Sequence, residues 1–305
     1  MDYKLLKSII KGSFTFIPGV NYLLEKKKRK SMHSGSNAEF VYSLWLSVLV
    51  YLSENKIKTS LSKIGEVGNG GSLGIAFCAL LTGSKEYYDF EYKGNINIPR
   101  QIELLDQILI LFNEKTPIKS YDHINIKVLD QSFPNDLIFS YEKQIEIAEK
   151  LKKDLHNNLN DSKLIHLVKH WERASSLSLN FVFSRAVMEH VLKPLDVYKA
   201  INKHLLPNSY MLHDIEFHSH GLTQQIDGHM RISNFWWYII FGKRSFYNNR
   251  WRMEQHLLTI KKTGFLIKKF QEIFRTDQYS KKQISYGGVI VSKNIDSLKY
   301  KISDN

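Results

Sequence analysis

The chain has 305 residues, of which 43% are hydrophobic and 12% aromatic, so it is long enough for one large domain and too apolar to be disordered. Its 43 Lys and Arg residues exceed its 30 Asp and Glu residues, and the formal charge of +13 favours an anionic partner: nucleic acid, an acidic membrane surface or an anionic substrate. The single cysteine, Cys78, excludes an intrachain disulfide.

The N-terminal segment "MDYKLLKSIIKGSFTFIPG" has lysines threaded through its apolar positions and lacks the uninterrupted apolar core of a signal peptide. The longest uncharged stretch, 40–53, is too short to span a bilayer, so we expect a cytoplasmic protein. Helical spacing of the apolar residues in 5–10, followed by the basic run 26–30, also suits peripheral contact with the inner face of an anionic membrane. A packing helix followed by a solvated charge run is the favoured alternative.

Short apolar runs rich in β-branched and aromatic residues alternate with helical patterns along the chain. The segment 38–56 reads as a buried helix that leads to the first strand. The predicted strands are 62–67, 86–92, 163–170, 179–184, 210–216, 264–271 and 287–293. The predicted helices between them are 72–81, 99–113, 140–155, 187–205 and 253–263. This alternation indicates a mostly parallel sheet with helices on both faces.

The last two predicted strands are separated only by "EIFRTDQYSKKQISY", which is tight for a helical crossover, so we expect the final strand to run antiparallel. Two long connections, 93–162 and 217–263, are expected to carry substrate recognition. The whole chain, 1–305, is then a single domain with an N-terminal helical segment over 1–58. Its Rossmann-like core comprises 59–216 and 264–293, interrupted by those two insertions.

A glycine-rich loop follows the first strand and reads Glu66-Val67-Gly68-Asn69-Gly70-Gly71-Ser72-Leu73-Gly74. It lacks the lysine of a P-loop, and its third glycine comes one residue late for a dinucleotide fingerprint. The acid Glu66 would also repel a pyrophosphate. S-adenosylmethionine (SAM) has no phosphate, and its carboxylate suits the N-terminus of the helix that follows. Glycines let the backbone approach such a ligand closely.

An acid at the end of the second strand would accept hydrogen bonds from the ribose hydroxyls of this cofactor. Glu91 lies 21 residues beyond Gly70, close to the spacing of roughly 20 typical of nucleotide sites. We favour Glu91, with Asp89 second; the alternative is that both are ordinary surface acids. The expected cofactor-binding residues are Glu66, Gly68, Asn69, Gly70, Ser72, Leu73, Gly74, Glu91, Ser184 and Arg185.

The fourth and fifth strands end in polar segments, "FSRAVMEHV" and "LHDIEFHSHGL". Ligands of doubly wound sheets bind outside the carboxyl ends of the strands, so these segments should lie at the reacting centre. Histidine is the side chain suited to act as general base near neutral pH. The expected catalytic residues are His190 or His220 as the base, with Glu189 or Glu216 orienting the imidazole. For His213, His218 and His229 a packing role is favoured.

A metal site at Glu216, His218 and His220 is the less favoured alternative, and no metal is expected. Isolated His-x-His pairs are common, and no cysteine supports the set.

The segments "EVGNGGSLG", "NFVFSRAVMEHV", "HDIEFHSHGL" and "KTGF" together resemble class I SAM-dependent methyltransferases of bacterial surface-polysaccharide biosynthesis clusters. The resemblance runs from about His33 to Phe270. It implies a Rossmann-like seven-stranded sheet with a reversed last strand. It also implies O-methylation of a sugar or polysaccharide precursor, with an anionic or lipid-linked acceptor. Departures from the family pattern are Asn69 for proline, Glu216 for aspartate and Met230 for tryptophan, the last of which bears on the substrate pocket.

Two other functions compete with this one. Nucleic-acid amine methyltransferases carry Asn/Asp-Pro-Pro-aromatic after the fourth strand, where this chain has "SRAV". Cytosine-C5 enzymes need a cysteine there, and Cys78 lies elsewhere, so no nucleic-acid partner is expected. A non-catalytic scaffold of the same fold is the other competitor. The aromatic segment 234–251 suits core and lid, with Arg244 and Arg250 either on an anionic substrate group or at the surface. The oligomeric state stays open.

Overall fold

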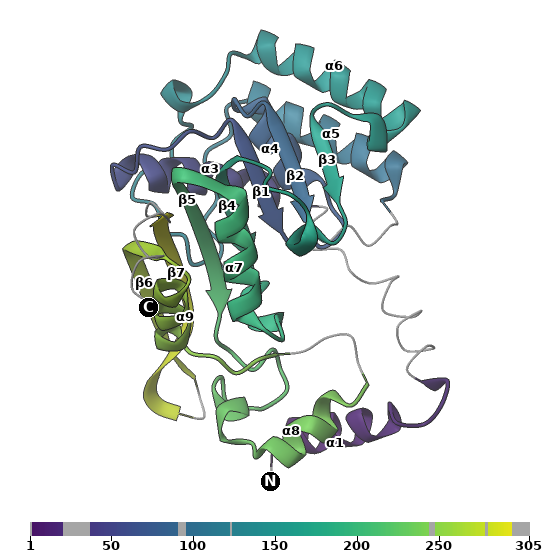
Figure 1. Cartoon of the computed structure of the whole chain (residues 1–305), viewed down its shortest axis with the longest axis vertical. Helices are drawn as coiled ribbons and strands as arrows, with labels where there is room; N and C mark the ends of the chain where they lie inside the picture. Colours follow the sequence, from purple (N-terminus) through teal and green to yellow (C-terminus); the bar gives the residue numbers. More distant parts are fainter. Residues whose placement is uncertain are drawn as a thin grey trace, which may run out of the picture.

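The computed structural model describes residues 2–20, 37–90, 96–122, 124–243, 248–277 and 280–294, and its centre is a seven-stranded sheet in the order β3-β2-β1-β4-β5-β7-β6 (Figure 1). The strands are β1 (Lys63–Val67), β2 (Glu86–Phe90), β3 (Ile165–Val168), β4 (Leu179–Arg185), β5 (Leu205–Glu216), β6 (Phe265–Asp277) and β7 (Ser280–Asn294). Strands β1 to β5 pair in parallel, and β7 runs antiparallel to both β5 and β6. The predicted Rossmann-like sheet with a reversed last strand is therefore confirmed.

Two separate hydrophobic clusters cover the two faces of this sheet. On one face lie α3 (Ala38–Glu54), α4 (Gly74–Leu81), α5 (Ile98–Asn113) and α6 (Tyr141–Asn157). On the other face lie α7 (Pro194–His204) and α9 (Met253–Lys262). Because successive side chains of a strand point to opposite faces, Phe181 and Phe183 of β4 enter the first cluster and Val182 enters the second.

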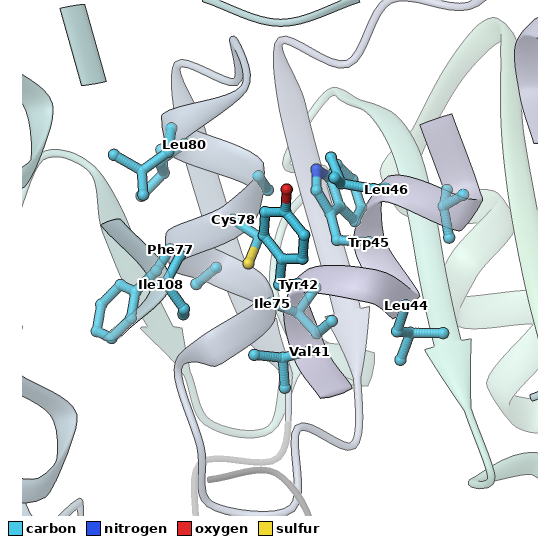
Figure 2. Packing of buried hydrophobic residues seen from close by; sticks show 14 of the residues in the cluster. Val41, Tyr42, Leu44, Trp45, Leu46, Ile75, Phe77, Cys78, Leu80 and Ile108 are labelled. Carbon is cyan, nitrogen blue, oxygen red and sulfur yellow. The ribbon is translucent and has the colours of Figure 1, made fainter. Parts of the chain in front are cut away.

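Helix α3 is buried on all sides, which its near-continuous apolar sequence requires. Figure 2 shows its side chains interleaved with those of α4. The indole Nε1 of Trp45 donates to Thr82 Oγ1 at 2.8 Å, so the one polar atom of this ring is satisfied in the core. At the other end of α4, a Cβ on Gly74 would lie 2.8 Å from Val41 Cγ2. Helix α3 therefore fixes where α4 begins, and with it the glycine loop that precedes α4.

The predicted helix 187–205 is confirmed only from Pro194 to His204, and its predicted start is wrong. A single 3-10 turn, η5 (Met188–His190), follows β4, and α7 begins only at Pro194. Proline has no N–H to donate and is suited to the first turn of a helix rather than its interior, so the helix starts there. His190 consequently lies on a short turn and not within a long helix.

Strands β5, β6 and β7 extend further than their apolar runs indicate. β5 begins at Leu205 instead of 210, and β6 and β7 form a long hairpin that includes most of the segment expected to connect them. In the hairpin, pairing with an antiparallel neighbour satisfies backbone groups whatever the side chains are, so polar residues continue β6 and β7.

The long connection 93–162 contains α5 and α6, which belong to the layer on the α3 face. Between these helices the chain reaches across to β5. Asn125 donates to the Asp214 carboxylate through its backbone N at 3.2 Å and through its Nδ2 at 2.6 Å. This part of the chain therefore helps to build the sheet layers, and its part in substrate recognition stays a prediction.

Beyond the carboxyl ends of the strands, α1 (Tyr3–Phe14) lies beside α8 (Asn234–Phe241) (Figure 1). The contact is close because a Cβ on Gly12 would lie 2.1 Å from the carbonyl oxygen of Ile239. Leu5 and Ile9 pack on a small cluster that includes Trp237. The start of the chain is thus docked on the second long connection, 217–263. Among the described residues, no helix is both long and apolar enough to cross a membrane.

Candidate functional site

The glycine loop leaves β1 through a turn with left-handed backbone conformations. Gly68, Gly70 and Gly71 have φ of +77°, +64° and +83°. A Cβ on Gly68 would lie 2.5 Å from Val187 Cγ2, whereas a Cβ on Gly70 or Gly71 would meet no described atom within 4 Å. Gly68 therefore joins the turn to the segment after β4, and the other two glycines are demanded by backbone conformation alone.

The next part of the loop is tied to the protein itself. Gly71 N donates to Asn69 Oδ1 at 2.8 Å, Leu73 N to Gln101 Oε1 at 2.9 Å and Gly74 N to Ser72 Oγ at 3.2 Å. Ser72, Leu73 and Gly74 are buried. Side chains of the chain thus satisfy amides that were expected to face a cofactor carboxylate. Gln101, on α5, had not been singled out, because nothing in its own sequence surroundings marks a residue that bonds a loop 28 positions earlier.

Asp89, at the end of β2, is fully buried and accepts a hydrogen bond from Asn69 Nδ2 at 2.5 Å. The two strands pair with Glu66 opposite Asp89, which brings the loop and the second strand end together. Asn69, where the resembling family has proline, thereby gains a bond that proline has no group to make. Glu91, the favoured ribose-binding residue, lies outside the described residues.

Glu66 is buried in β1 and accepts a hydrogen bond from the Tyr87 hydroxyl at 2.5 Å. Burial raises the pKa of Glu66 to about 7, and the bond from Tyr87 only partly offsets that effect. The carboxyl is therefore a neutral group at acidic pH and becomes charged near pH 7, which relieves the repulsion that a permanent charge would exert on another anion.

Ser184 and His213 face the α7 side of the sheet, where the Ser184 hydroxyl and His213 Nδ1 lie 2.7 Å apart. Both side chains are fully buried. Burial lowers the pKa of His213 to about 3, so its ring is neutral. The partner of Ser184 is thus an internal histidine, whether or not the serine also contacts a cofactor.

Arg185, one residue on, points to the opposite face and binds Glu216. Its Nη2 lies 3.1 Å from Glu216 Oε1, and its guanidinium lies 5.1 Å from the ring centroid of Phe40. The other oxygen of Glu216 is 2.6 Å from His218 Nε2. Burial works against ionisation of Glu216, but the bond with His218 and the charge of Arg185 outweigh it and lower its pKa. Glu216 is therefore a charge-compensated carboxylate.

Five residues from the ends of β4 and β5 meet here, and we call them the histidine–glutamate cluster: Glu189, His190, Glu216, His218 and His220. Glu189 Oε1 lies 3.8 Å from His190 Nε2 and 4.0 Å from His220 Nε2, and Glu216 Oε2 lies 3.9 Å from His220 Nδ1. The four expected catalytic residues are thus neighbours, and His218 joins them.

Burial shifts the pKa values of two residues of the cluster in opposite directions. Burial, reinforced by the charge of Glu216, raises the pKa of Glu189 well above its ordinary value. Burial and the neighbouring His218 and His190 lower the pKa of His220 to about 3. The nearby backbone N–H of Glu189 itself opposes this rise in pKa, although neither carboxylate oxygen of Glu189 has a hydrogen-bond partner among the described residues. Burial therefore disfavours the charged form of both Glu189 and His220.

Two asparagines after α8 hold the cluster in place. The backbone N of Asn249 donates to the Glu189 carbonyl at 2.7 Å, and its Nδ2 donates to the carbonyls of Met188 and Val191 at 2.7 and 2.9 Å. Asn248 Nδ2 donates to the His218 carbonyl at 3.3 Å. Neither asparagine was predicted, because polar residues in an irregular segment give no periodic signal.

Arg250 serves the same segment. It donates to the Ile232 carbonyl and to Asn234 Oδ1, both at 2.5 Å, and its guanidinium lies 4.8 Å from the ring centroid of Trp237. These contacts anchor the loop to α8.

Arg244 lies outside the described residues. His229 is buried near the same tryptophan, in agreement with the packing role favoured for it.

The strand order and the reversed β7 define a Rossmann-like fold with one antiparallel strand. No protein-family model matches the chain, and no curated protein matches it. A SAM-dependent methyltransferase structure from Methanosarcina mazei aligns with 80% of this chain and 97% of its own, at 12% identity and a TM-score of 0.40. One from Mesorhizobium loti aligns with 76% and 90%, at 9% identity and a TM-score of 0.39. The fold assignment rests on the strand order itself.

Replacing Glu66 by glutamine should remove a pH dependence of stability. The folded-state pKa of about 7 exceeds the ordinary value of 4.5, so the folded state binds this proton more tightly and stability falls as pH rises between those values. Relative to Glu66→Gln, the wild type should lose roughly 3 kcal/mol of unfolding free energy from pH 4.5 to pH 8, measured by urea denaturation. Glu114→Gln, at an exposed position, is the control. A difference that does not vary with pH would contradict the assignment.

Proposed function

We propose that this chain is a SAM-dependent O-methyltransferase that acts on a sugar or polysaccharide precursor. One observation carries the proposal: the turn after β1 lies against Val187, two residues before Glu189 of the histidine–glutamate cluster. A ligand held by the turn would therefore stand next to groups able to handle a hydroxyl proton. The carboxyl edge of a doubly wound sheet is also where such ligands bind.

For the cofactor, we propose that the turn 69–71 lies along its methionine and ribose portions. Gly70 and Gly71 have no side chain to keep a ligand from the backbone, and Glu91 follows directly on β2 in the sequence. Asp89 is the second acid at this strand end, although its bond with Asn69 already employs one oxygen. SAM brings a good leaving group, so the protein has mainly to align and desolvate the reactants.

For the acceptor, we propose that the cluster removes the hydroxyl proton. His190 and His220 are 24% and 18% exposed at their side chains, whereas Glu189 is 3% exposed, so the imidazoles face outward and the carboxyl lies behind them. In the transfer, the acceptor oxygen forms a bond to the methyl carbon as the carbon–sulfur bond breaks, leaving a neutral thioether. The sugar or polysaccharide acceptor rests on the resemblance of "SRAVMEHV" and "HDIEFHSHGL" to the family named above.

Binding of S-adenosylhomocysteine tests the cofactor site first. Wild type should bind with micromolar affinity in calorimetry, and Gly70→Ala should weaken binding at least about tenfold, because a Cβ at φ +64° strains the turn by roughly 1–2 kcal/mol. Gly19→Ala is the matched control: it also has positive φ and an open surrounding, but lies near α1. Wild type that binds no S-adenosylhomocysteine, or equal losses in both variants, would contradict the cofactor assignment.

Methyl transfer tests the acceptor class. Labelled SAM should methylate nucleotide sugars or glycan precursors in the presence of wild type, and Gly70→Ala should lose this activity in proportion to its cofactor affinity. Transfer RNA and DNA serve as competing acceptors. Methylation of nucleic acid in place of sugars would replace the proposed acceptor, and cofactor binding with no transfer to any of these would favour the scaffold alternative.

We also propose that the helix pair α1–α8 rests on an anionic membrane surface, which would suit a lipid-linked acceptor. While one face of α1 packs on α8, residues of both helices remain exposed: Tyr3, Leu6, Ile10, Phe14, Phe235, Trp236 and Tyr238. Exposed Lys7 and Lys11 flank this surface on α1, and no acid lies within the helix. Apolar side chains flanked by lysine match the interface of an anionic bilayer.

Vesicle sedimentation checks this surface. The protein should pellet with phosphatidylglycerol vesicles at low salt and much less with phosphatidylcholine vesicles, because lysines add electrostatic attraction. The double variant Ile10→Ser, Trp236→Ser should reduce binding severalfold. Leu129→Ser is the control, since Leu129 is 94% exposed but lies outside the helix pair. Binding that ignores vesicle charge, or that Leu129→Ser weakens equally, would contradict the proposal.

A further inference from the structure

We infer that Glu189, His190 and His220 form a binding site for one divalent transition-metal ion. Each residue offers one ligand atom, and the three atoms lie within 4.8 Å of one another. Two imidazoles and one carboxylate are a ligand set that zinc, manganese and iron accept. Two ligand atoms of a tetrahedral zinc ion, each about 2.1 Å from the metal, lie about 3.4 Å apart. The separations of 3.8 and 4.0 Å thus need to contract only slightly.

Glu189 supplies an independent reason to place a cation here. Its carboxyl is 3% exposed, and among the described residues neither of its oxygens has a hydrogen-bond partner. A buried carboxylate without a donor is costly, and such groups are normally paired or coordinate a metal. Asn249 fixes the backbone on both sides of Glu189, so the carboxyl cannot turn outward at little cost.

Glu216 has a different part. Its two oxygens are already bound by Arg185 and His218, so its charge is compensated without a metal. It lies 3.9 Å from His220 Nδ1, on the far side of the ring from Nε2. Carboxylates in this position commonly orient a metal-bound imidazole by accepting from its other nitrogen. This argues for the Glu189 triad over the alternative group of Glu216, His218 and His220, which also lies within 4.8 Å.

The site is buried on one side and accessible on the other. The side chains of His190 and His220 are 24% and 18% exposed, which leaves a coordination position for an outside oxygen. The role of the ion rests on the proposed function: held by the cluster, it would bind the acceptor hydroxyl and lower its pKa, and this would be how the cluster promotes loss of the hydroxyl proton. The hydroxyl proton passes to water, the oxygen bonds to the methyl carbon, and the sulfonium becomes a thioether as its carbon–sulfur bond breaks.

Metal binding is measured without cofactor or acceptor, so its outcome is separate from that of methyl transfer. Tag-free protein, stripped with chelator and dialysed, is titrated with Zn²⁺ by calorimetry and with Co²⁺ by visible absorption. We expect one ion per chain with micromolar or tighter affinity. Glu189→Gln and His220→Ala should each weaken binding at least tenfold. His156→Ala, an exposed histidine on α6, should bind like wild type.

Two further measurements distinguish loss of a metal ligand from loss of the fold. Each variant is checked by its binding of S-adenosylhomocysteine and its thermal melting, so that a misfolded variant is recognised. Absence of binding by a wild type with a normal melting transition, or affinities that Glu189→Gln leaves unchanged while His218→Ala abolishes them, would overturn the Glu189 triad. Loss of cofactor binding by the wild type would instead count against the proposed function and leave the metal measurement standing.

Discussion

Parallel pairing of β1 with β2 on one side and β4 on the other is the constraint on which the rest of the site depends. It sets Glu66 opposite Asp89 in one neighbour and Phe183 in the other, so three strands end at one edge of the sheet. The glycine turn then leaves between them and contacts Val187. Strand β5 adds His213 and Glu216 to that shared edge beside β4.

Several buried carboxyl groups lie at this edge, and they differ in their bonding partners. Glu66 has a tyrosine hydroxyl and a raised pKa, Asp214 has two bonds from Asn125, and Glu216 has an arginine and a histidine. Glu189 has none of these. Burial of acids lowers stability, and proteins keep such groups mainly where they act on a ligand.

Segments distant in sequence complete the site from outside the sheet. Hydrogen bonds from Asn248 and Asn249 join the segments after β4 and β5 to the connection that carries α8. Helix α1 in turn packs on α8 at Gly12. A contact made at the exposed face of the helix pair is therefore connected to the histidine–glutamate cluster by one continuous run of packed residues.

The sequence by itself determined the strands, their mostly parallel order and the reversed last strand, because alternation and chain length between strands are local properties. It also marked the glycine turn, whose residues at 68, 70 and 71 do adopt positive φ. Only the tertiary structure decided which side chains meet. The bonds of Gln101 to Leu73, Asn125 to Asp214 and Asn249 to the η5 turn join residues far apart, and such pairs leave no periodic trace. Neighbouring residues of β4 face opposite layers, so Ser184 contacts His213 on one side of the sheet and Arg185 pairs with Glu216 on the other.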